Sequence, residues 1–398
     1  MPSCSVFALC IDPSLGRLNY ESMNQQALME MAVSQMSAQN QSFYKDKNGH
    51  FRDISEWKNL TFNDDDTLRE IVTTFPHDNR KPAGQGTVLF QWFPETVEEI
   101  WLTNRGFEGT IDCAQLPKRL RELHCGNNRF TGSLRLECLP TGIQKLSLSR
   151  NFLSGTVDLQ CLPKGLRYLN LFWNTLEGSI VFPRESLLES LFLGDNRLTG
   201  TLNASEIPRS LLKFSAEMNA LEGTLDFSQL PPNLKDLRIY KNKFHGSVSF
   251  QNLPASLEFL SIKENAFSGT VDLTHLPKPL KHVMCSKNSF SGTVCLTQLP
   301  PTLVFLALSS NAFAGNISLK NLPDTLHEVY LHKNRFCGDL DLTSLPINLT
   351  TLWLNQNAFE GTVRIRDLPR AICRLKVKKN NNWKDVQLID IGLFNVIE

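Results

Sequence analysis

The amino-acid sequence predicts a right-handed solenoid of about 13 short coils, an α/β fold rich in β structure whose parallel strands line the concave side of a horseshoe. Three observations predict this fold. A glycine recurs about every 23 residues, an Asn precedes nearly every one of these glycines by four positions, and apolar residues alternate just before each Asn. Self-similarity at a fixed period of about 20–50 residues is the signature of units that stack on one another.

The glycines of Phe/Leu-x-Gly triplets define the period. Successive glycines are 23 residues apart except for one interval of 22, between Gly178 and Gly200, and they stand at positions 109, 132, 155, 178, 200, 223, 246, 269, 292, 315, 338 and 361. An Asn lies four residues before each of them from Asn128 to Asn357, and Arg105 takes that place in the first copy. A proline eleven residues before most of these positions repeats with the same period.

Residues 257–277 illustrate what each part of a coil should do. Leu260 and Ile262 alternate with polar residues, as in a short strand that turns two side chains toward the core. The Asn that follows can bond backbone groups of neighbouring turns through its amide. The chain after Gly269 alternates like a second short strand, and Leu-Pro then bends it back. The Phe or Leu two residues after each Asn should form one stacked row in a continuous core.

This pattern resembles the leucine-rich-repeat family. Its Asn-x-Phe-x-Gly-Thr-Val segment looks like the plant-type class, and its Leu-Pro-x-x-Leu-x-x-Leu-x-Leu segment is closer to leucine-rich-repeat proteins of protists, kinetoplastids in particular. The resemblance covers about residues 90–385 and implies the solenoid fold. It implies little about function because the family serves many roles, although its horseshoes mostly hold proteins.

The period divides the chain into three regions. Residues 1–89 are expected to form an N-terminal helical capping region, residues 90–382 the repeat array, and residues 383–398 a C-terminal cap. The last region is strongly apolar, so it should cover the open end of the core. Contact with another subunit is the alternative use of the same residues.

Two helices are expected in the N-terminal region. Apolar residues at helical spacing predict one over residues 20–38, and a capping box from Asp65 to Glu70 predicts a second one through Phe75. The run of three acids at 64–66 lacks the alternating ligands of a calcium loop, so the helix cap is the favoured interpretation.

Composition narrows the function classes. The chain has 41 Lys and Arg against 40 Asp and Glu, which disfavours binding to polyanions through net charge alone. No signal peptide or membrane-spanning run is evident, and ten cysteines in 398 residues are too few for a disulfide scaffold. We therefore expect an intracellular, cytoplasmic protein without membrane contact. Cys138 and Cys161 share a register in adjacent coils, so a disulfide or metal pair there stays open.

No arrangement of residues indicates catalysis. The sequence contains no His-Glu-x-x-His, Cys-x-x-Cys or Gly-x-Ser-x-Gly motif, and no region outside the array is large enough for a catalytic domain. His282, His327 and His332 could share the concave face, but surface histidines do so by accident. We expect neither an enzyme nor a cofactor nor a metal site.

The variable positions of each strand unit should face the concave side. Aromatic and Arg side chains, which are typical of binding hot spots, concentrate at these positions. The candidate partner-binding residues are Tyr168, Phe172, Trp173, Phe192, Arg238, Tyr240, Phe259, Phe305, Tyr330, His332 and Trp353. The sequence thus predicts a non-enzymatic scaffold that captures a protein or peptide on its concave face.

A basic patch at the end of the array supports an alternative. It comprises Arg374, Lys376, Lys378 and Lys379. Basic residues interleaved with aromatic ones are also typical of proteins that bind single-stranded RNA, so a scaffold for RNA or ribonucleoprotein is the second hypothesis. An extracellular recognition receptor is the third. The identity of the partner and the oligomeric state are not encoded in any motif.

Overall fold

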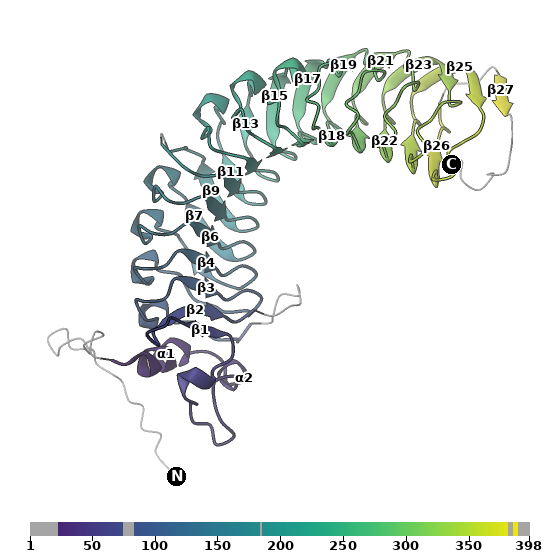
Figure 1. Ribbon diagram of the computed structural model, residues 1–398. Helices are drawn as coiled ribbons and strands as arrows, with labels where there is room; N and C mark the ends of the chain where they lie inside the picture. Colours follow the sequence, from purple (N-terminus) through teal and green to yellow (C-terminus); the bar gives the residue numbers. More distant parts are fainter. Residues whose placement is uncertain (1–22, 75–82, 184, 381–384, 389–398) are drawn as a thin grey trace, which may run out of the picture.

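The computed structural model describes residues 23–74, 83–183, 185–380 and 385–388, which form a curved solenoid (Figure 1). One 15-stranded sheet lines its concave side, and the strand order follows the chain. Each coil of the array contributes one three-residue strand, paired in parallel with the next. These strands are β3 (Glu99–Trp101), β4 (Glu122–His124), β6 (Lys145–Ser147), β8 (Tyr168–Asn170), β10 (Ser190–Phe192), β12 (Lys213–Ser215), β14 (Asp236–Arg238), β16 (Phe259–Ser261), β18 (His282–Met284), β20 (Phe305–Ala307), β22 (Glu328–Tyr330), β24 (Thr351–Trp353) and β26 (Arg374–Lys376).

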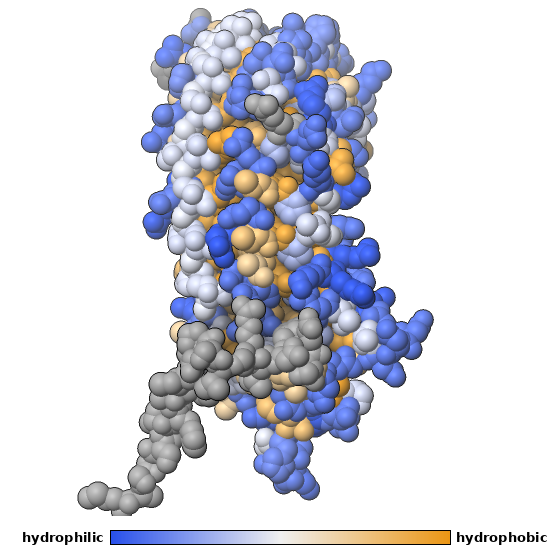
Figure 2. Space-filling model, turned by 90° about the vertical axis from the view of Figure 1, so that its left-hand side faces the viewer, coloured by the Kyte–Doolittle hydropathy of each residue, from blue (hydrophilic) through white to orange (hydrophobic). Residues whose placement is uncertain are grey.

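Second strands follow the Asn turn in most coils, as predicted. They form a four-stranded sheet of β5 (Thr131–Gly132), β7 (Phe152–Thr156), β9 (Thr175–Ser179) and β11 (Arg197–Thr199). An eight-stranded sheet contains β13 (Glu222–Gly223), β15 (Lys243–Ser247), β17 (Ala266–Thr270), β19 (Ser289–Gly292), β21 (Ala312–Gly315), β23 (Arg335–Asp341), β25 (Ala358–Ile365) and β27 (Asp385–Leu388). Figure 2 shows a band of intermediate hydropathy along one side of the solenoid, the hydropathy of the glycine, serine and threonine that recur in these strands.

The repeat glycine is required by close packing between coils. Gly178 has φ 86°, a left-handed conformation that favours glycine. A Cβ atom there would lie 2.8 Å from Cγ2 of Thr156 in the preceding coil. The small residue therefore lets adjacent second strands approach each other.

Short 3₁₀ helices complete six of the coils, all before β16, on the side away from the concave sheet. They are η4 (Cys113–Gln115), η5 (Leu136–Cys138), η6 (Leu159–Cys161), η7 (Ala204–Glu206), η8 (Phe227–Gln229) and η9 (Phe250–Asn252). Cys138 and Cys161 close two adjacent ones and are both free thiols, and the Cys161 Sγ donates to Asp158 Oδ2 at 3.3 Å.

The predicted phenylalanine row is confirmed. Five fully buried rings of successive coils stack nearly parallel, with centroids 6.0–6.3 Å apart and interplanar angles of 6–13°: Phe244, Phe267, Phe290, Phe313 and Phe336. Leucines fill the same register in four earlier coils, at Leu153, Leu176, Leu198 and Leu221, all buried.

The Asn ladder is also confirmed. The Asn128 amide donates to the carbonyls of Leu102 at 2.7 Å and Cys125 at 2.9 Å, while its Oδ1 accepts from the backbone N–H groups of Arg105 and Phe107 at 3.1 Å. Each such side chain thus ties its own turn to the preceding coil.

The N-terminal region covers the first coil with two helices and a hairpin. The helices are α1 (Gln25–Val33) and α2 (Ala38–Gln41), and β1 (Leu60–Phe62) pairs antiparallel with β2 (Leu68–Val72). Single 3₁₀ turns occur at η2 (Ile54–Glu56) and η3 (Phe90–Trp92). None of the described helices is long and apolar enough to cross a membrane.

The prediction of a second helix through Phe75 is wrong. The supposed capping box is the hairpin turn: the Asp65 carboxylate accepts from the Thr67 hydroxyl at 2.6 Å and from its N–H at 3.1 Å. Leu68 and Ile71 are both buried in this strand. Its buried residues are thus three positions apart, a spacing that is typical of a helix. Ile71 pairs with Ile100 of β3, and β2 thereby covers the edge of the array.

Deleting residues 1–85 is expected to cause aggregation. The deletion removes β2 and leaves the hydrogen-bonding edge of β3 open, together with the apolar surface that Leu68 and Ile71 cover. Size-exclusion chromatography with light scattering would detect the resulting large species. A monodisperse, folded truncation would show that the array needs no N-terminal cap.

At the opposite end only β27 of the predicted C-terminal cap is described. It extends the second sheet by pairing in parallel with β25, Val363 opposite Val386. The predicted apolar contacts of residues 389–398 lie outside the described residues.

The second sheet is interrupted just after the single 22-residue interval. β11 still pairs with β9 across that interval, whereas β11 and β13 of the next coil share only the isolated bridge between Thr201 and Glu222. No 3₁₀ helix forms in the described residues between η6 and η7. The concave sheet runs on uninterrupted, and the solenoid bends at this point (Figure 1).

Candidate functional site

Three columns of side chains cover the concave sheet. The middle residue of each strand is buried, so the first and third residues face outward and form columns one and two. Column three lies two residues after the strand. In the coil of β8 these positions are Tyr168, Asn170 and Phe172. All the candidate aromatic residues lie in these columns except Trp173, which directly follows column three.

The N-terminal aromatic cluster comprises Tyr168, Phe172, Trp173 and Phe192. It consists of two ring pairs: Tyr168 and Phe192 have centroids 5.6 Å apart, and Phe172 and Trp173 meet edge to face at 6.5 Å. Asn170 lies between the pairs, donating to the Tyr168 hydroxyl at 3.2 Å and accepting from the Phe172 N–H at 3.1 Å. Trp173 is 48% exposed, although Arg150 lies over its ring at 5.3 Å.

A longer C-terminal aromatic row crosses five strands from β16 to β24. It runs through Phe259, His282, Phe305, Tyr330 and Trp353, with successive ring centroids 5.1, 6.3, 5.5 and 5.1 Å apart. His332 also contacts it, 5.1 Å from Trp353. Sequence reasoning missed His282 as the link between two phenylalanines, although its place in column one between Phe259 and Phe305 is readable from the repeat.

Cations lie over rings at both ends of this row. Arg238 lies 4.3 Å from the Phe259 centroid and Lys376 lies 4.7 Å from that of Trp353. Lys263 similarly covers Tyr240 at 4.8 Å. The ring faces of these residues on the concave sheet are therefore in contact with neighbouring rings or cations.

The predicted basic patch adjoins the row. Arg374 and Lys376 are the first and third residues of β26, and the exposed Lys378 and Lys379 follow the strand. Trp353 pairs in register with Lys376, so the patch begins where the aromatic row ends.

Burial controls the ionisation of groups in the row. It raises the pKa of Tyr330 to about 12, with help from the hydrogen bond that its hydroxyl donates to Glu328 at 2.6 Å. Burial, and then the nearby Lys333 and Lys376, lowers the pKa of His332. Four buried polar atoms here lack hydrogen-bond partners within the described part of the chain: His332 Nδ1, Trp353 Nε1, Asn355 Oδ1 and Gln356 Oε1.

Glu217 is a second residue that sequence reasoning missed. It stands in column three, is 5% exposed and accepts a hydrogen bond from the Ser215 hydroxyl at 2.6 Å. Burial raises its pKa above the ordinary carboxyl value. The sequence does carry a signal: Glu217 is an acidic residue in column three, and the residue in the same column of the preceding coil is a glycine, Gly194.

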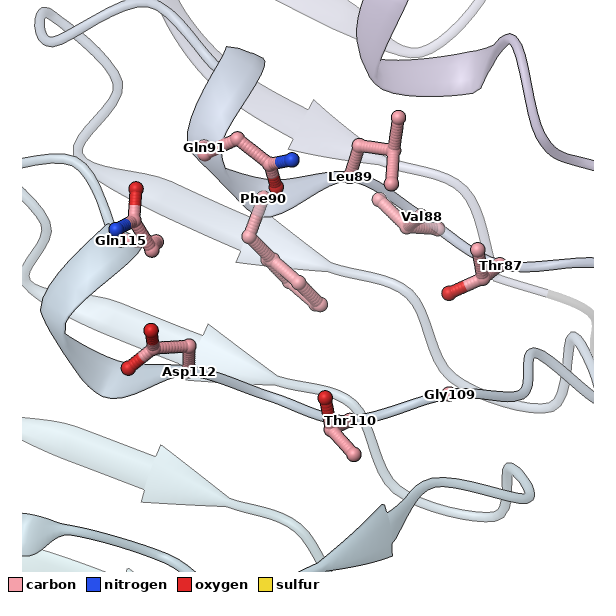
Figure 3. Close-up of a pocket in the computed structure, with 9 residues that line it drawn as sticks. All are labelled: Thr87, Val88, Leu89, Phe90, Gln91, Gly109, Thr110, Asp112 and Gln115. Atoms are coloured by element: carbon pink, nitrogen blue, oxygen red, sulfur yellow. The ribbon is translucent and has the colours of Figure 1, made fainter. Parts of the chain in front are cut away.

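No catalytic or metal-binding arrangement emerges from the described residues. They contain no group of three His, Cys, Asp or Glu side chains that could hold a metal ion. A cavity of about 520 Å³ lies between residues 87–91 and the first coil; in Figure 3 Gln91, Asp112 and Gln115 border one side and Thr87 and Thr110 the other. Arg135 already binds the Asp112 carboxylate at 3.2 Å.

Comparison with known proteins identifies the repeat. Residues 235–367 match the BspA type leucine rich repeat region in six copies. No curated protein matches the chain significantly.

Solved structures share the fold. The ectodomain of the membrane receptor kinase GASSHO1/SCHENGEN3 from Arabidopsis thaliana, in complex with CASPARIAN STRIP INTEGRITY FACTOR 2, is 24% identical over 74% of this chain and 39% of its own, with a TM-score of 0.54. The plant peptide hormone receptor RGFR1 in complex with RGF2 is 22% identical over 73% of this chain and 56% of its own, with a TM-score of 0.52. A plant ice-binding protein is 18% identical over 74% of this chain and 88% of its own, with a TM-score of 0.50.

The chain thus spans about two fifths to three fifths of these receptor ectodomains. At such identities the likeness concerns the fold alone. Together with the 23-residue period and the stacked core, it identifies the fold as a leucine-rich-repeat solenoid, in which residues 235–367 match the family model in six copies.

Proposed function

We propose that this protein is a non-enzymatic scaffold whose concave face binds an extended segment of a protein or peptide. One observation carries the proposal: the N-terminal aromatic cluster and the C-terminal aromatic row project from the concave sheet although the core does not need them. The inward positions beside Tyr168 and Phe192 are filled by fully buried leucines, Leu169 and Leu191. Partly exposed aromatic rings on a rigid face are typical of binding hot spots.

The backbone prepares this face for binding. Each strand from β3 to β24 is held on both sides by parallel pairing, and the Asn ladder fixes the turn that follows. A ligand would therefore meet side chains already held in place, and little conformational entropy would be lost on binding. The complexes named in the receptor structures support the same use of the fold.

The basic patch favours RNA as a second candidate. Bases bind such surfaces by stacking on free aromatic faces. Here Trp353 is covered by Lys376 and edge-on to Tyr330, and Phe259 is covered by Arg238. This arrangement suits the apolar side chains of a peptide better than it suits stacked bases.

Cysteine usage supports an intracellular, cytoplasmic location. The eight described cysteines are all free thiols, and Cys161, Cys295 and Cys373 are exposed. Exposed thiols persist in reducing compartments, whereas oxidising ones promote disulfides.

The test combines Phe172→Ala and Trp173→Ala in one variant. Peptides of twelve residues would be selected from a phage-displayed random library on the native protein, synthesised, and titrated by fluorescence polarisation. We expect the double variant to weaken binding by about 2–4 kcal/mol with a nearly unchanged melting temperature, because both rings lie outside the core.

The control is Lys376→Glu with Lys378→Glu, titrated with the same peptides and with single-stranded oligouridine. Oligouridine binding that falls steeply with salt and with this charge reversal, combined with no peptide selection, would favour the RNA hypothesis. A lower melting temperature of the aromatic variant would place the rings in the core and contradict the proposed site.

A further inference from the structure

A group of polar side chains, named the polar recess for the burial of Ser215, Glu217 and Ser261, separates the N-terminal aromatic cluster from the C-terminal aromatic row. We define it by Ser215, Glu217, Arg238, Tyr240 and Ser261, which lie on or just after β12, β14 and β16. Ser215 pairs with Phe192 on one side, so the recess begins directly beside the cluster. Ser215 and Ser261 flank Arg238 in column two, and both serines are buried.

The Glu217 carboxyl lies over the preceding coil rather than in solvent. Gly194 makes this possible, since a Cβ atom at that position would lie 2.7 Å from Glu217 Cδ. The carboxyl accepts a hydrogen bond from the neutral Ser215 hydroxyl. Within the described residues no Lys, Arg or His lies within ion-pair distance of Glu217. A buried carboxylate without a cation is unfavourable, and proteins seldom retain one without a use for it.

Cations near the recess are committed to other groups. Arg238 holds Asp236 through three contacts, Nε at 2.9 and 3.2 Å and Nη2 at 2.9 Å, and its other contact is with the Phe259 ring. Lys263 lies over Tyr240. The remaining charges around Tyr240 are acidic: Glu217, Asp195 and Glu264 all act on its hydroxyl. Arg238 is the cation of the recess that acts on both Glu217 and Tyr240, and its guanidinium is already bound to Asp236.

Ser261 provides an independent sign of an unfilled polar site. Its side chain is 1% exposed, and its Oγ has no hydrogen-bond partner within the described part of the chain. It pairs in register with Arg238, on the side opposite Ser215. The recess thus contains a buried acid without an ion-pair partner and a buried hydroxyl without a hydrogen-bond partner, two strands apart.

We propose that the polar recess receives the cationic end of a lysine or arginine side chain from the bound segment, with Glu217 as its counterion. This inference rests on the proposed function and adds a specificity. Adjacent strands lie about 4.8 Å apart and an extended peptide advances about 3.3 Å per residue. Phe192 lies one strand from Ser215 and Phe259 lies two strands away. The cationic residue should therefore have apolar neighbours within about three positions on both sides.

The experiment uses the full chain and the twelve-residue peptides selected from the phage-displayed library. We expect the selected peptides to share a Lys or Arg flanked by apolar residues. Each synthetic peptide would be compared with a copy in which norleucine or citrulline replaces that residue, which tests the native protein without any variant. At least a tenfold loss of affinity is expected.

Glu217→Gln completes a double-mutant cycle. This variant keeps a hydrogen-bonding partner for Ser215, should fold with an equal or higher melting temperature, and should bind the cationic peptide at least tenfold more weakly than the native protein does. It should bind the neutral copy equally well. Glu222→Gln, an exposed acid on β13 of the other sheet, is the matched control and should change neither affinity.

Two results would overturn the inference: selected peptides without a shared cation, or equal affinities of the cationic peptide for Glu217→Gln and the native protein. If those peptides still lose affinity for the Phe172→Ala, Trp173→Ala variant, the proposed function stands and only the assigned recess fails. If no peptide is selected at all, the proposed function itself fails.

Discussion

Replacing Phe290 with Ala is expected to lower the free energy of unfolding by about 3–5 kcal/mol, the range for a large buried aromatic ring. Phe290 is fully buried and stacks on Phe267 at 6.3 Å and on Phe313 at 6.1 Å. Phe250 meets it edge-on at 6.4 Å. The parallel backbone ladders on both sides of the core restrict collapse into the resulting cavity, so the cost should lie near the upper end.

Urea denaturation followed by circular dichroism would measure this loss. Ile347→Ala is the control, because Ile347 is 70% exposed and its truncation should change the unfolding free energy by less than about 0.5 kcal/mol. Equal midpoints for the two variants would contradict the stacked core.

Asn128→Ala should destabilise the protein by roughly 2–3 kcal/mol, since each buried polar group left without a partner costs about 1–3 kcal/mol. The substitution removes the amide that binds the Leu102 and Cys125 carbonyls and the oxygen that accepts from Arg105 and Phe107. Alanine offers none of these contacts, and Asn128 has no exposed surface.

Two further Asn residues make this prediction specific. Asn265→Ala should cost less, about 1–2 kcal/mol, because the Asn265 oxygen accepts from one backbone N–H instead of two and the side chain is only partly buried. Asn252→Ala should have almost no effect, since Asn252 is exposed. A common urea midpoint for all three variants would mean that the ladder contributes no stability.

The repeat array was predictable from the sequence because nearly every coil has the same residue types at the same positions. The strand leucines, the Asn and the glycine each have one structural task; the glycine recurs in twelve copies and the Asn precedes it in eleven of them. The N-terminal hairpin was not predictable in this way. Asp65 and Thr67 form hydrogen bonds that suit either a helix start or a tight turn, and the pairing of β2 with β3 decides between them.

The candidate site was predictable in its columns but not in its contacts. Alternation along the strand placed Phe259, Phe305 and Trp353 on the concave face. Side-chain rotamers and neighbours one coil away determine which rings touch. They also determine that Arg238 binds Asp236 rather than Glu217. Glu217 became notable only once its burial over Gly194 was known.

Because the second sheet is broken, the number of hydrogen-bonded ladders between neighbouring coils is not the same along the solenoid. In a stack of coils, stability spreads through nearest-neighbour interfaces, so cooperativity is limited by the weakest interface. Most coil pairs are tied by two ladders, whereas the coils of β11 and β13 share one full ladder and a single bridge. That interface is expected to limit cooperativity between the coils on its two sides, and Glu217 and the polar recess lie just beyond it. A ligand that reaches from Phe192 to the polar recess would contact coils on both sides of the interface and so strengthen the coupling between them.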